Sequence, residues 1–220
     1  SLYVRSLIKI KKRELKPLKR LSICVIWLKI YTMDLNKTSF YLNFPGMRDC
    51  LSVFEQNKLR TLGAQFRQTN RGGLATFHGP GQITAYPVLN LRHFKPSIKG
   101  FVWNLEQTII HTRNTFLRSP NTGVWVQDNK ICAIGVHVSR GVTTHGLAIN
   151  CCTDLKWFEH IIPCGIEGKG VTSVSKELTK TVTIETVLPI LKNCFENIFD
   201  CHLVEMTDEE KNSILEAVKS

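Results

Sequence analysis

The sequence predicts an α+β domain with a mixed or antiparallel sheet and flanking helices. Short β-rich segments cluster in the middle of the chain, and segments with helical periodicity dominate its C-terminal part. The 220 residues, 43% of them hydrophobic, suffice for one domain with a hydrophobic core and exclude a disordered chain. The densest apolar run, Leu21–Ile30, is too short to cross a bilayer and contains Lys29, so no membrane span is expected.

Positive charge is concentrated at the N-terminal end. The first 60 residues contain 13 lysines and arginines against four acidic residues, whereas the rest of the chain is nearly balanced. The sequence pI of 9.4 therefore does not predict nucleic-acid binding by the folded part. We interpret residues 1–55 as a basic, divergent segment, either a targeting or an aberrant sequence, and residues 56–220 as the folded domain. Residues 1–50 are expected to pack weakly and to add little to the core.

A glycine-rich loop precedes the first strand expected in this domain. Four glycines and a proline lie within Gly72–Gly81, bracketed by Arg71 and His78. Such a loop lets the backbone approach a ligand closely, so we favour a ligand-binding loop over a plain strand connection. It matches neither the P-loop nor the dinucleotide-binding spacing. The apolar run Ile83–Leu91 follows and predicts a buried strand.

Helical and β-rich segments alternate after this strand. The segment Phe101–Phe116 predicts a helix, and its apolar face is made of Val102, Leu105, Ile109 and Phe116. Residues 124–127 and 130–134 flank Asp128-Asn129 and predict a hairpin. Residues 147–151 predict one more strand.

Two helices are expected at the C-terminal end. Thr183 fits the N-cap of a helix through Phe199, and the expected buried face holds Val187, Ile190, Leu191, Cys194, Phe195 and Ile198. Thr207 and Glu210 have the spacing of a capping box, which predicts a last short helix.

Three residues outside the glycine-rich loop are candidates for chemistry. Cys164 lies between a proline and a glycine, in a turn where a thiolate can be exposed, although a cysteine taken alone is more often a small buried hydrophobe. Lys130 begins a predicted strand, and a solvated surface charge is its alternative reading. His145 fits a loop donor and a core-edge histidine equally well.

No metal site is expected. The eight cysteines show no evenly spaced framework, and the adjacent Cys151 and Cys152 cannot supply the usual C-x-x-C hook of a zinc site. Reduced thiols are therefore expected rather than disulfides.

Five motifs occur in the order and spacing of one enzyme family. They are Arg71-Gly72-Gly73-x-x-Thr76-Phe77-His78-Gly79-Pro80-Gly81-Gln82, Lys130-Ile131-x-Ala133-Ile134-Gly135, His145-Gly146-Leu147-Ala148-x-Asn150, Pro163-Cys164-Gly165 and Gly170-Val171-Thr172-Ser173. On these motifs the chain resembles the lipoyl(octanoyl) transferases, the octanoyl-[acyl-carrier-protein]:protein N-octanoyltransferases of lipoate biosynthesis. The segments between Gly146 and His160 look most like the animal mitochondrial branch, which implies a mitochondrial location.

The resemblance implies a fold and a two-step acyl transfer. The implied fold is similar to the catalytic domain of lipoate and biotin protein ligases, here within residues 56–220. Enzymes of the family move an octanoyl group from acyl carrier protein onto a cysteine and then onto the ε-amine of a lysine in a lipoyl domain. Cys164 matches the cysteine that carries the acyl thioester. Lys130 matches the lysine that acts as base and favours the thiolate.

The other matched positions imply substrate binding. They are Arg71, Gly72, Gly73, Leu74, Ala75, Thr76, Phe77, His78, Ala133, Ile134, Gly135, Gly146, Leu147 and Ala148, with His145 in a supporting role. Their small side chains and backbone N–H groups suit an acyl chain and a thioester carbonyl. No cofactor, metal or ATP is implied.

The resemblance also implies the partners. They are octanoyl-acyl carrier protein as donor and lipoyl-domain proteins as acceptors, namely glycine cleavage H protein and the acyltransferase subunits of 2-oxoacid dehydrogenases. No nucleic acid is expected among them.

One motif of the family is not found. The family carries E-H-P-x-x-Y-T-x-G before the glycine-rich loop, and residues 1–58 do not contain it. Two alternatives therefore stay open. One is an impaired paralogue or fragment that binds acyl carrier protein or lipoyl domains without turnover, and the other is a ligase of the same superfamily that uses ATP and free lipoate.

Overall fold

The computed structural model describes residues 2–12, 26–33, 38–43, 53–73, 75–94, 97–112, 117–118, 121–161 and 168–217. The strands are β1 (Leu2–Lys12), β2 (Ile26–Met33), β3 (Thr38–Asn43), β4 (Ala64–Thr69), β5 (Thr76–His78), β6 (Gln82–Val88), β7 (Leu117–Arg118), β8 (Val124–Val126), β9 (Asn129–Ser139), β10 (Val142–Asn150), β11 (Gly170–Val171) and β12 (Cys201–Glu205). The helices are α1 (Val53–Thr61), α2 (Leu91–Phe94), α3 (Ile98–Thr112), the 3-10 helix η1 (Leu155–His160), α4 (Val174–Glu177), α5 (Ile184–Phe199) and α6 (Asp208–Ala217).

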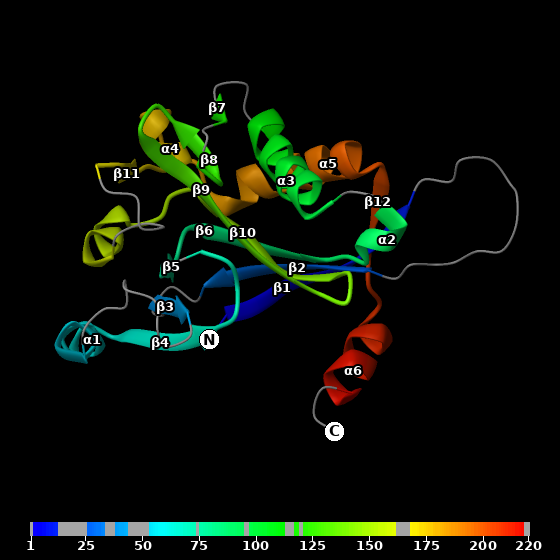
Figure 1. Cartoon of the computed structure of the whole chain (residues 1–220), viewed down its shortest axis with the longest axis horizontal. Coiled ribbons are helices and arrows are strands. Elements are labelled where there is room, and N and C mark those ends of the chain that lie inside the picture. Colours follow the sequence, from blue (N-terminus) through cyan, green and yellow to red (C-terminus); the bar gives the residue numbers. More distant parts are fainter. Residues whose placement is uncertain are drawn as a thin grey trace, which may run out of the picture.

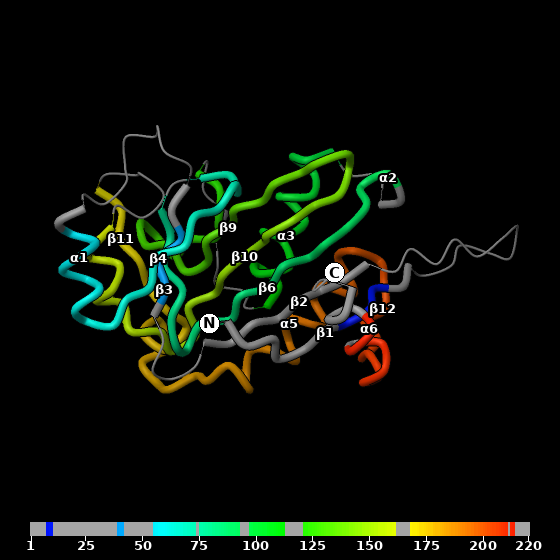
Figure 2. Tube along the Cα trace, turned by 90° about the horizontal axis from the view of Figure 1, so that it is seen from below, coloured from blue at the N-terminus to red at the C-terminus, as the bar shows by residue number. Residues whose placement is uncertain are grey.

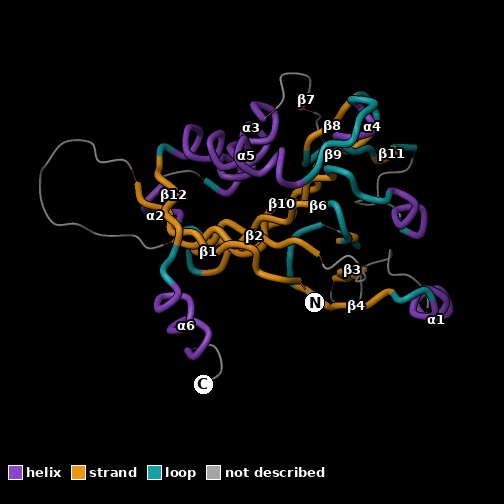
Figure 3. Tube along the Cα trace, turned by 180° about the vertical axis from the view of Figure 1, so that it is seen from behind, coloured by secondary structure: helices purple, strands orange, loops and turns teal. Residues whose placement is uncertain are grey.

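Most described strands form one large sheet with the order β12-β1-β2-β6-β10-β9-β8-β7, and β11 pairs with β9 (Figure 1). Strands β4, β3 and β5 form a small second sheet, which lies with α1 at one end of the molecule, whereas α6 lies at the other (Figure 3). The pairings are antiparallel except β11 with β9 and β3 with β4. The prediction of an α+β domain with a mixed or antiparallel sheet is confirmed.

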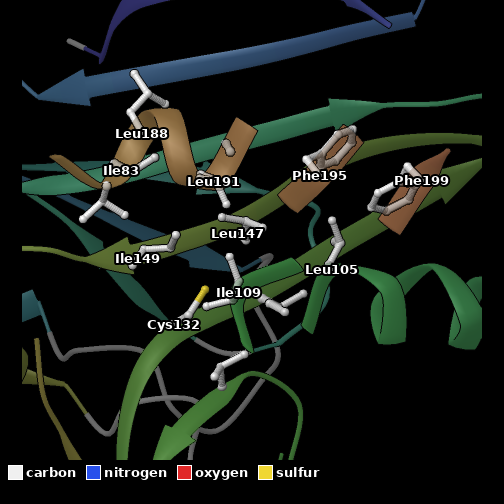
Figure 4. Close-up of a cluster of buried hydrophobic side chains, with 14 of the residues drawn as sticks. Ile83, Leu105, Ile109, Cys132, Leu147, Ile149, Leu188, Leu191, Phe195 and Phe199 are labelled. Atoms are coloured by element: carbon white, nitrogen blue, oxygen red, sulfur yellow. The ribbon is translucent and has the colours of Figure 1, made fainter. Parts of the chain in front are cut away.

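Helices α3 and α5 lie side by side over one face of the large sheet (Figures 1 and 2). Their apolar stripes bury the main core against β6, β9 and β10, as Figure 4 shows; its members include Leu105, Ile109, Leu188, Leu191, Phe195, Ile83, Leu147 and Ile149. Since side chains alternate along a strand, Ala148 and Asn150 of β10 point to the opposite face. That opposite face holds the candidate site.

The N-terminal segment is expected from its composition to pack weakly, and this expectation is wrong. Strand β1 pairs with β2 and β12, and β2 pairs with β6, so both belong to the large sheet. Ile8 and Ile10 of β1 are buried in the main core, and Phe40 of β3 is buried in the core of the small sheet. The alternation of Ile8, Lys9 and Ile10 is that of a strand with one buried face. The basic residues around it obscure this pattern.

The integration of β1 can be tested at Ile10, which is fully buried. Truncation of Ile10 to alanine leaves a cavity, so we expect the free energy of unfolding in urea to fall by about 2–5 kcal/mol. Val204 of β12 is 36% exposed and serves as control, because Val204→Ala is expected to change stability by less than about 0.5 kcal/mol. Equal, small losses in both variants would show that β1 adds nothing to the core.

Several locally encoded elements match their predictions. The hairpin forms from β8 and β9, although its two-residue turn is Gln127-Asp128 rather than Asp128-Asn129. Thr183 is the N-cap residue of α5. The capping box is present, because Thr207 Oγ1 accepts from the Glu210 N–H at 3.3 Å and Glu210 Oε2 accepts from the Thr207 N–H at 3.1 Å. Ile190, expected on the buried face of α5, is 37% exposed instead. The helix predicted over Phe101–Phe116 corresponds to α3, and its predicted end at Phe116 lies outside the described residues.

Candidate functional site

The first part of the candidate site is a cleft on the face of the large sheet opposite α3 and α5. It holds about 320 Å³ of empty space, solvent at its mouth included. Its walls come from β5, β6, β9, β10, β11 and the end of η1, and they are lined by Ala75, Thr76, Gln82, Lys130, Ala133, Ala148, Asn150, Phe158, Ile161 and Val171. Lys130 is the cationic residue among these small, apolar and amide side chains.

A β-bulge directs Lys130 into this cleft. Trp125 of β8 pairs with Lys130, but Val124 pairs with Cys132, so Ile131 is an extra residue in β9. The extra residue shifts the alternation of side chains. Lys130 and Ala133 therefore line the same cleft, whereas Cys132 joins the core beneath the helices.

The Lys130 side chain is 3% exposed. Its Nζ has no hydrogen-bond partner among the residues that the structure describes, and it lies 4.5 Å from the centre of the Trp125 ring. The alternative reading of Lys130 as a solvated surface charge is therefore wrong. Burying an amine without a hydrogen-bond partner costs stability, so its burial makes Lys130 a candidate functional residue.

A chain of amide hydrogen bonds forms the cleft wall beside Lys130. Gln82 Nε2 donates to Asn150 Oδ1 at 2.8 Å, and Asn150 Nδ2 donates to the Thr172 carbonyl at 2.9 Å. The Thr172 N–H in turn donates to the Lys130 carbonyl at 2.9 Å. These bonds fix β11, which follows the Pro163-Cys164-Gly165 motif in the chain, against the strand of Lys130.

A second cleft of about 390 Å³ continues from the first and shares Thr76, Ala133 and Ala148 with it. Its other lining residues are Arg71, Gly73, His78, Tyr86, Ile134, Gly135, His145, Gly146 and Leu147. The structure thus brings together the three segments for which the resemblance implies substrate binding. Of those residues, Leu74 lies outside the described part of the chain, and Gly72 and Phe77 do not line either cleft.

Gly72 and Phe77 support the clefts from behind. The Gly72 N–H donates to the Val136 carbonyl at 3.0 Å, which ties the loop to β9. Phe77 packs in the small core, 5.0 Å from the ring of Phe158. Gly146 is required at its position, since a Cβ there would come within 2.2 Å of the Ala85 carbonyl oxygen on β6.

His78 is a buried, neutral member of the second cleft. Burial lowers the pKa of His78 from 6.5 to about 4, aided by the charges of Arg71 and His145 and opposed by the hydrogen bond to Gln82. Because Gln82 Nε2 donates to Asn150, Gln82 Oε1 accepts from His78 Nδ1–H at 2.7 Å. This assignment leaves His78 Nε2 as a hydrogen-bond acceptor.

The buried His78 predicts loss of stability in acid. Its contribution is complete above pH 6.5 and is lost as the pH falls toward 4, because the unfolded chain binds the proton more readily over that range. The shift corresponds to about 3 kcal/mol. We expect the free energy of unfolding in urea to fall less steeply with acid in His78→Asn, whose amide can keep the bond to Gln82. If the free energy of unfolding decreased equally steeply with falling pH in the wild-type protein and in His78→Asn, a neutral, buried His78 would be contradicted.

His145 lies at the rim of the second cleft in a left-handed conformation, with φ +60° inside β10. Its Nε2 lies 3.1 Å from Asn70 Oδ1, and its ring meets that of Tyr86 edge-on. Partial burial lowers its pKa, and so do the charges of Arg71 and His137. A non-glycine residue in this conformation stores strain, which is common at binding sites.

Cys132, Cys151 and Cys152 are free thiols and are poor candidates for a nucleophile. Burial raises the pKa of the Cys132 thiol well above its usual range and that of Cys151 to about 12. Cys152 is exposed, and its pKa is raised as well. Cys164 lies outside the described residues, so its role stays a prediction. Ile161 and Val171, on either side of it in the chain, both line the cleft of Lys130.

Some site residues have no role in the sequence-based prediction. The motifs include Gln82 and Asn150 but give them no function. The two residues pair with each other at the start of β6 and the end of β10. Each is a polar amide in an otherwise apolar strand, and this is the sequence signal that could have identified Gln82 and Asn150. Trp125 and Phe158 carry no such signal, because an aromatic residue in a strand or helix is typically part of a core.

Within the described parts of the chain, no group of acidic, histidine and cysteine side chains could hold a metal ion. None of the helices described there is long and apolar enough to span a bilayer.

Comparison with known proteins gives one consistent result. The family model described as the lipoyl protein ligase A/B catalytic domain matches residues 46–196. The chain is 54% identical over 153 residues to the octanoyl-[acyl-carrier-protein]:protein N-octanoyltransferase LIPT2, mitochondrial, of Danio rerio, covering 68% of each chain. It is 49% identical over 166 residues to the protein of the same name from Homo sapiens, covering 72% of each.

The fold is also found in solved structures. The bi-partite lipoate protein ligase of Thermoplasma acidophilum, solved in work that included its E2 lipoyl domain, superposes with a TM-score of 0.64 at 16% identity. The match covers 84% of this chain and 76% of that one. At this identity the likeness is one of fold, and it confirms the expected similarity to lipoate ligases.

Proposed function

The chain belongs to the lipoyl protein ligase A/B catalytic domain family, and from this premise we propose that it transfers an octanoyl group from octanoyl-acyl carrier protein to lysine ε-amines of lipoyl domains. It is an acyltransferase of protein lipoylation, and it is mitochondrial like its animal relatives. Glycine cleavage H protein and the acyltransferase subunits of 2-oxoacid dehydrogenases are the proposed acceptors.

One observation carries the assignment of chemistry to this site. The Lys130 amine is buried, belongs to a residue that lines the cleft, and has no hydrogen-bond partner among the described residues. An amine in such a place can accept a proton from a thiol and, as ammonium, stabilise the resulting thiolate. Ile161, which precedes Cys164 in the chain, and Val171, which follows it, line the same cleft. Their position supports Cys164 as that thiol.

In the first half-reaction, the Cys164 thiol gives its proton to the Lys130 amine. The thiolate then attacks the thioester carbonyl of octanoyl-acyl carrier protein. A new carbon–sulfur bond forms to Cys164, and the bond to the phosphopantetheine sulfur breaks. That sulfur leaves with the proton held by Lys130. One thioester replaces another, so the step needs no ATP.

In the second half-reaction, the lysine amine of a lipoyl domain attacks the Cys164 thioester. A carbon–nitrogen bond forms, the proton of the amine passes to Lys130, and Cys164 leaves as thiolate. The resting pair of ammonium and thiolate is restored. An amide is more stable than a thioester, which drives the transfer forward.

The octanoyl chain is proposed to lie along the part shared by the two clefts. The shared side chains, Thr76, Ala133 and Ala148, are small, and Ala75 and Phe158 extend the apolar lining toward Lys130. Arg71, His78 and His145 close the opposite end with polar groups. An octanoyl chain that begins near Lys130 would therefore end close to these polar side chains.

Intact-mass spectrometry with octanoyl-acyl carrier protein tests this function. We expect the protein to gain one octanoyl group, which a lipoyl domain then removes and carries as an amide without ATP. Binding without an adduct or transfer would identify an impaired paralogue. Transfer from free acid that requires ATP would identify a ligase.

A further inference from the structure

Glu106 is a buried carboxylate on α3, and the reaction described above gives it no role. It lies on α3 among the apolar residues that face the sheet and is 2% exposed. Its Oε1 accepts a hydrogen bond from the N–H of Gly123 at 3.1 Å. A buried carboxylate is costly unless it is hydrogen-bonded, so this bond holds both partners in place.

Gly123 lies close to the stem of Lys130. A Cβ at this position would lie 3.4 Å from Lys130 Cε and 2.7 Å from the Cys132 carbonyl oxygen. Its φ of +114° is one that residues with a side chain rarely adopt. The backbone at Gly123 is therefore near the lysine stem and is hydrogen-bonded to the Glu106 carboxylate.

The same segment holds Lys130 at its charged end. The Trp125 ring lies 4.5 Å from Lys130 Nζ, and the Trp125 indole N–H donates to the Asn121 carbonyl at 3.1 Å. Within residues 121–125, Gly123 thus lies close to the stem of Lys130 and Trp125 lies close to its amine. Glu106 ties this segment to α3.

We propose that Glu106 is a positioning residue for Lys130, acting through its hydrogen bond to Gly123. The inference rests on the proposed function, because the role of Lys130 belongs to it. A lysine side chain has four rotatable bonds, and the amine must reach both the thiol and the leaving group. Fixing the segment that covers the stem keeps the amine pointed into the cleft, which supports catalysis by orientation.

Conservative variants separate the hydrogen bond from the charge. Glu106→Gln keeps an acceptor oxygen at the same reach and loses the charge. Glu106→Asp keeps the charge, but its shorter side chain cannot reach the Gly123 N–H. Glu106→Ala removes both. If Glu106 acts through its hydrogen bond to Gly123, Glu106→Gln should keep turnover and Glu106→Asp should lose it.

The test measures single-turnover octanoyl transfer by the full chain, with thermal melting of each variant. We expect Glu106→Ala and Glu106→Asp to lower the transfer rate constant by up to about 10²-fold, the effect of a catalytic group displaced by about 1 Å, with little change in the concentration dependence on donor. Glu106→Gln should recover most of the rate. If the alanine variant does not fold, the aspartate and glutamine variants decide alone.

A double-mutant cycle with Lys130→Ala provides a readout that a merely structural role would not move. If Glu106 acts through Lys130, its replacement should lower transfer no further once Lys130 is absent. The matched control is Glu196→Ala on α5, since Glu196 Oε1 likewise accepts a backbone N–H, that of Leu203, at 2.6 Å. This variant should lose stability but keep the transfer rate.

Three outcomes would overturn the inference in a wild-type protein that transfers octanoate. They are full activity of a folded Glu106→Asp variant, loss in Glu106→Gln equal to that in Glu106→Asp, and an undiminished loss in the Lys130→Ala background. A wild-type protein without transfer would instead contradict the proposed function, so the two failures are distinguishable.

Discussion

Replacing Cys164 with alanine is expected to abolish octanoyl transfer and to remove the octanoyl adduct seen by intact-mass spectrometry. The reason is that the proposed reaction passes through a thioester on this sulfur, and alanine offers no nucleophile. The adduct on the wild-type protein should be released by neutral hydroxylamine, as a thioester is. The melting temperature should change little, because the variant removes only one sulfur atom.

Cys152→Ala is the matched control for this experiment. Cys152 is an exposed free thiol in the same protein, and its raised pKa disfavours the thiolate. This variant should keep both the adduct and the transfer. An adduct that persists in Cys164→Ala, or one that is lost in Cys152→Ala, would assign the acyl group to another residue.

Replacing Lys130 with alanine is expected to lower octanoyl transfer by about 10²–10⁴-fold, the usual range for loss of a general base. The rate of Cys164 alkylation by iodoacetamide should also fall at neutral pH, and its rise with pH should move to higher pH, because the thiolate loses the neighbouring ammonium. Both rates are measured from pH 6 to about pH 10, a range that spans the ordinary thiol pKa.

Lys130→Arg separates the charge from the base. A guanidinium keeps the positive charge but does not release its proton, so alkylation should recover while transfer does not. Lys156→Ala, on the exposed surface of η1, should leave both rates unchanged. Unchanged turnover in Lys130→Ala would contradict a catalytic role and leave its burial unexplained.

The parts of the fold that the sequence predicts correctly are those set by local interactions. The capping box of Thr207 and Glu210 joins residues within one helical turn, and the periodicity of α3 and α5 records which side of each helix is apolar. The hairpin of β8 and β9 depends on a two-residue turn. Such signals are readable because every partner lies within a few residues.

The candidate site is also predictable in part, because its residues lie in motifs. The motifs assign the loop at Arg71, the strand end at Lys130 and the segment at His145 to one substrate site. The structure brings Arg71 and His145 into one cleft and Lys130 into the cleft that continues it. The role of Cys164 stays a prediction, since it lies outside the described residues.

Long-range pairing is decided by the tertiary structure alone. Strand β1 finds β12 from the other end of the chain, and no local signal in a basic segment announces that partner. The burial of Lys130 depends on the extra residue in β9 and on contacts with Gly123 and Trp125. A lysine is exposed or buried according to what packs over it, and here the bulged pairing of β8 with β9 decides that packing. Sequence alone therefore identifies the chemical groups, and the fold determines the buried environment in which Lys130 lies.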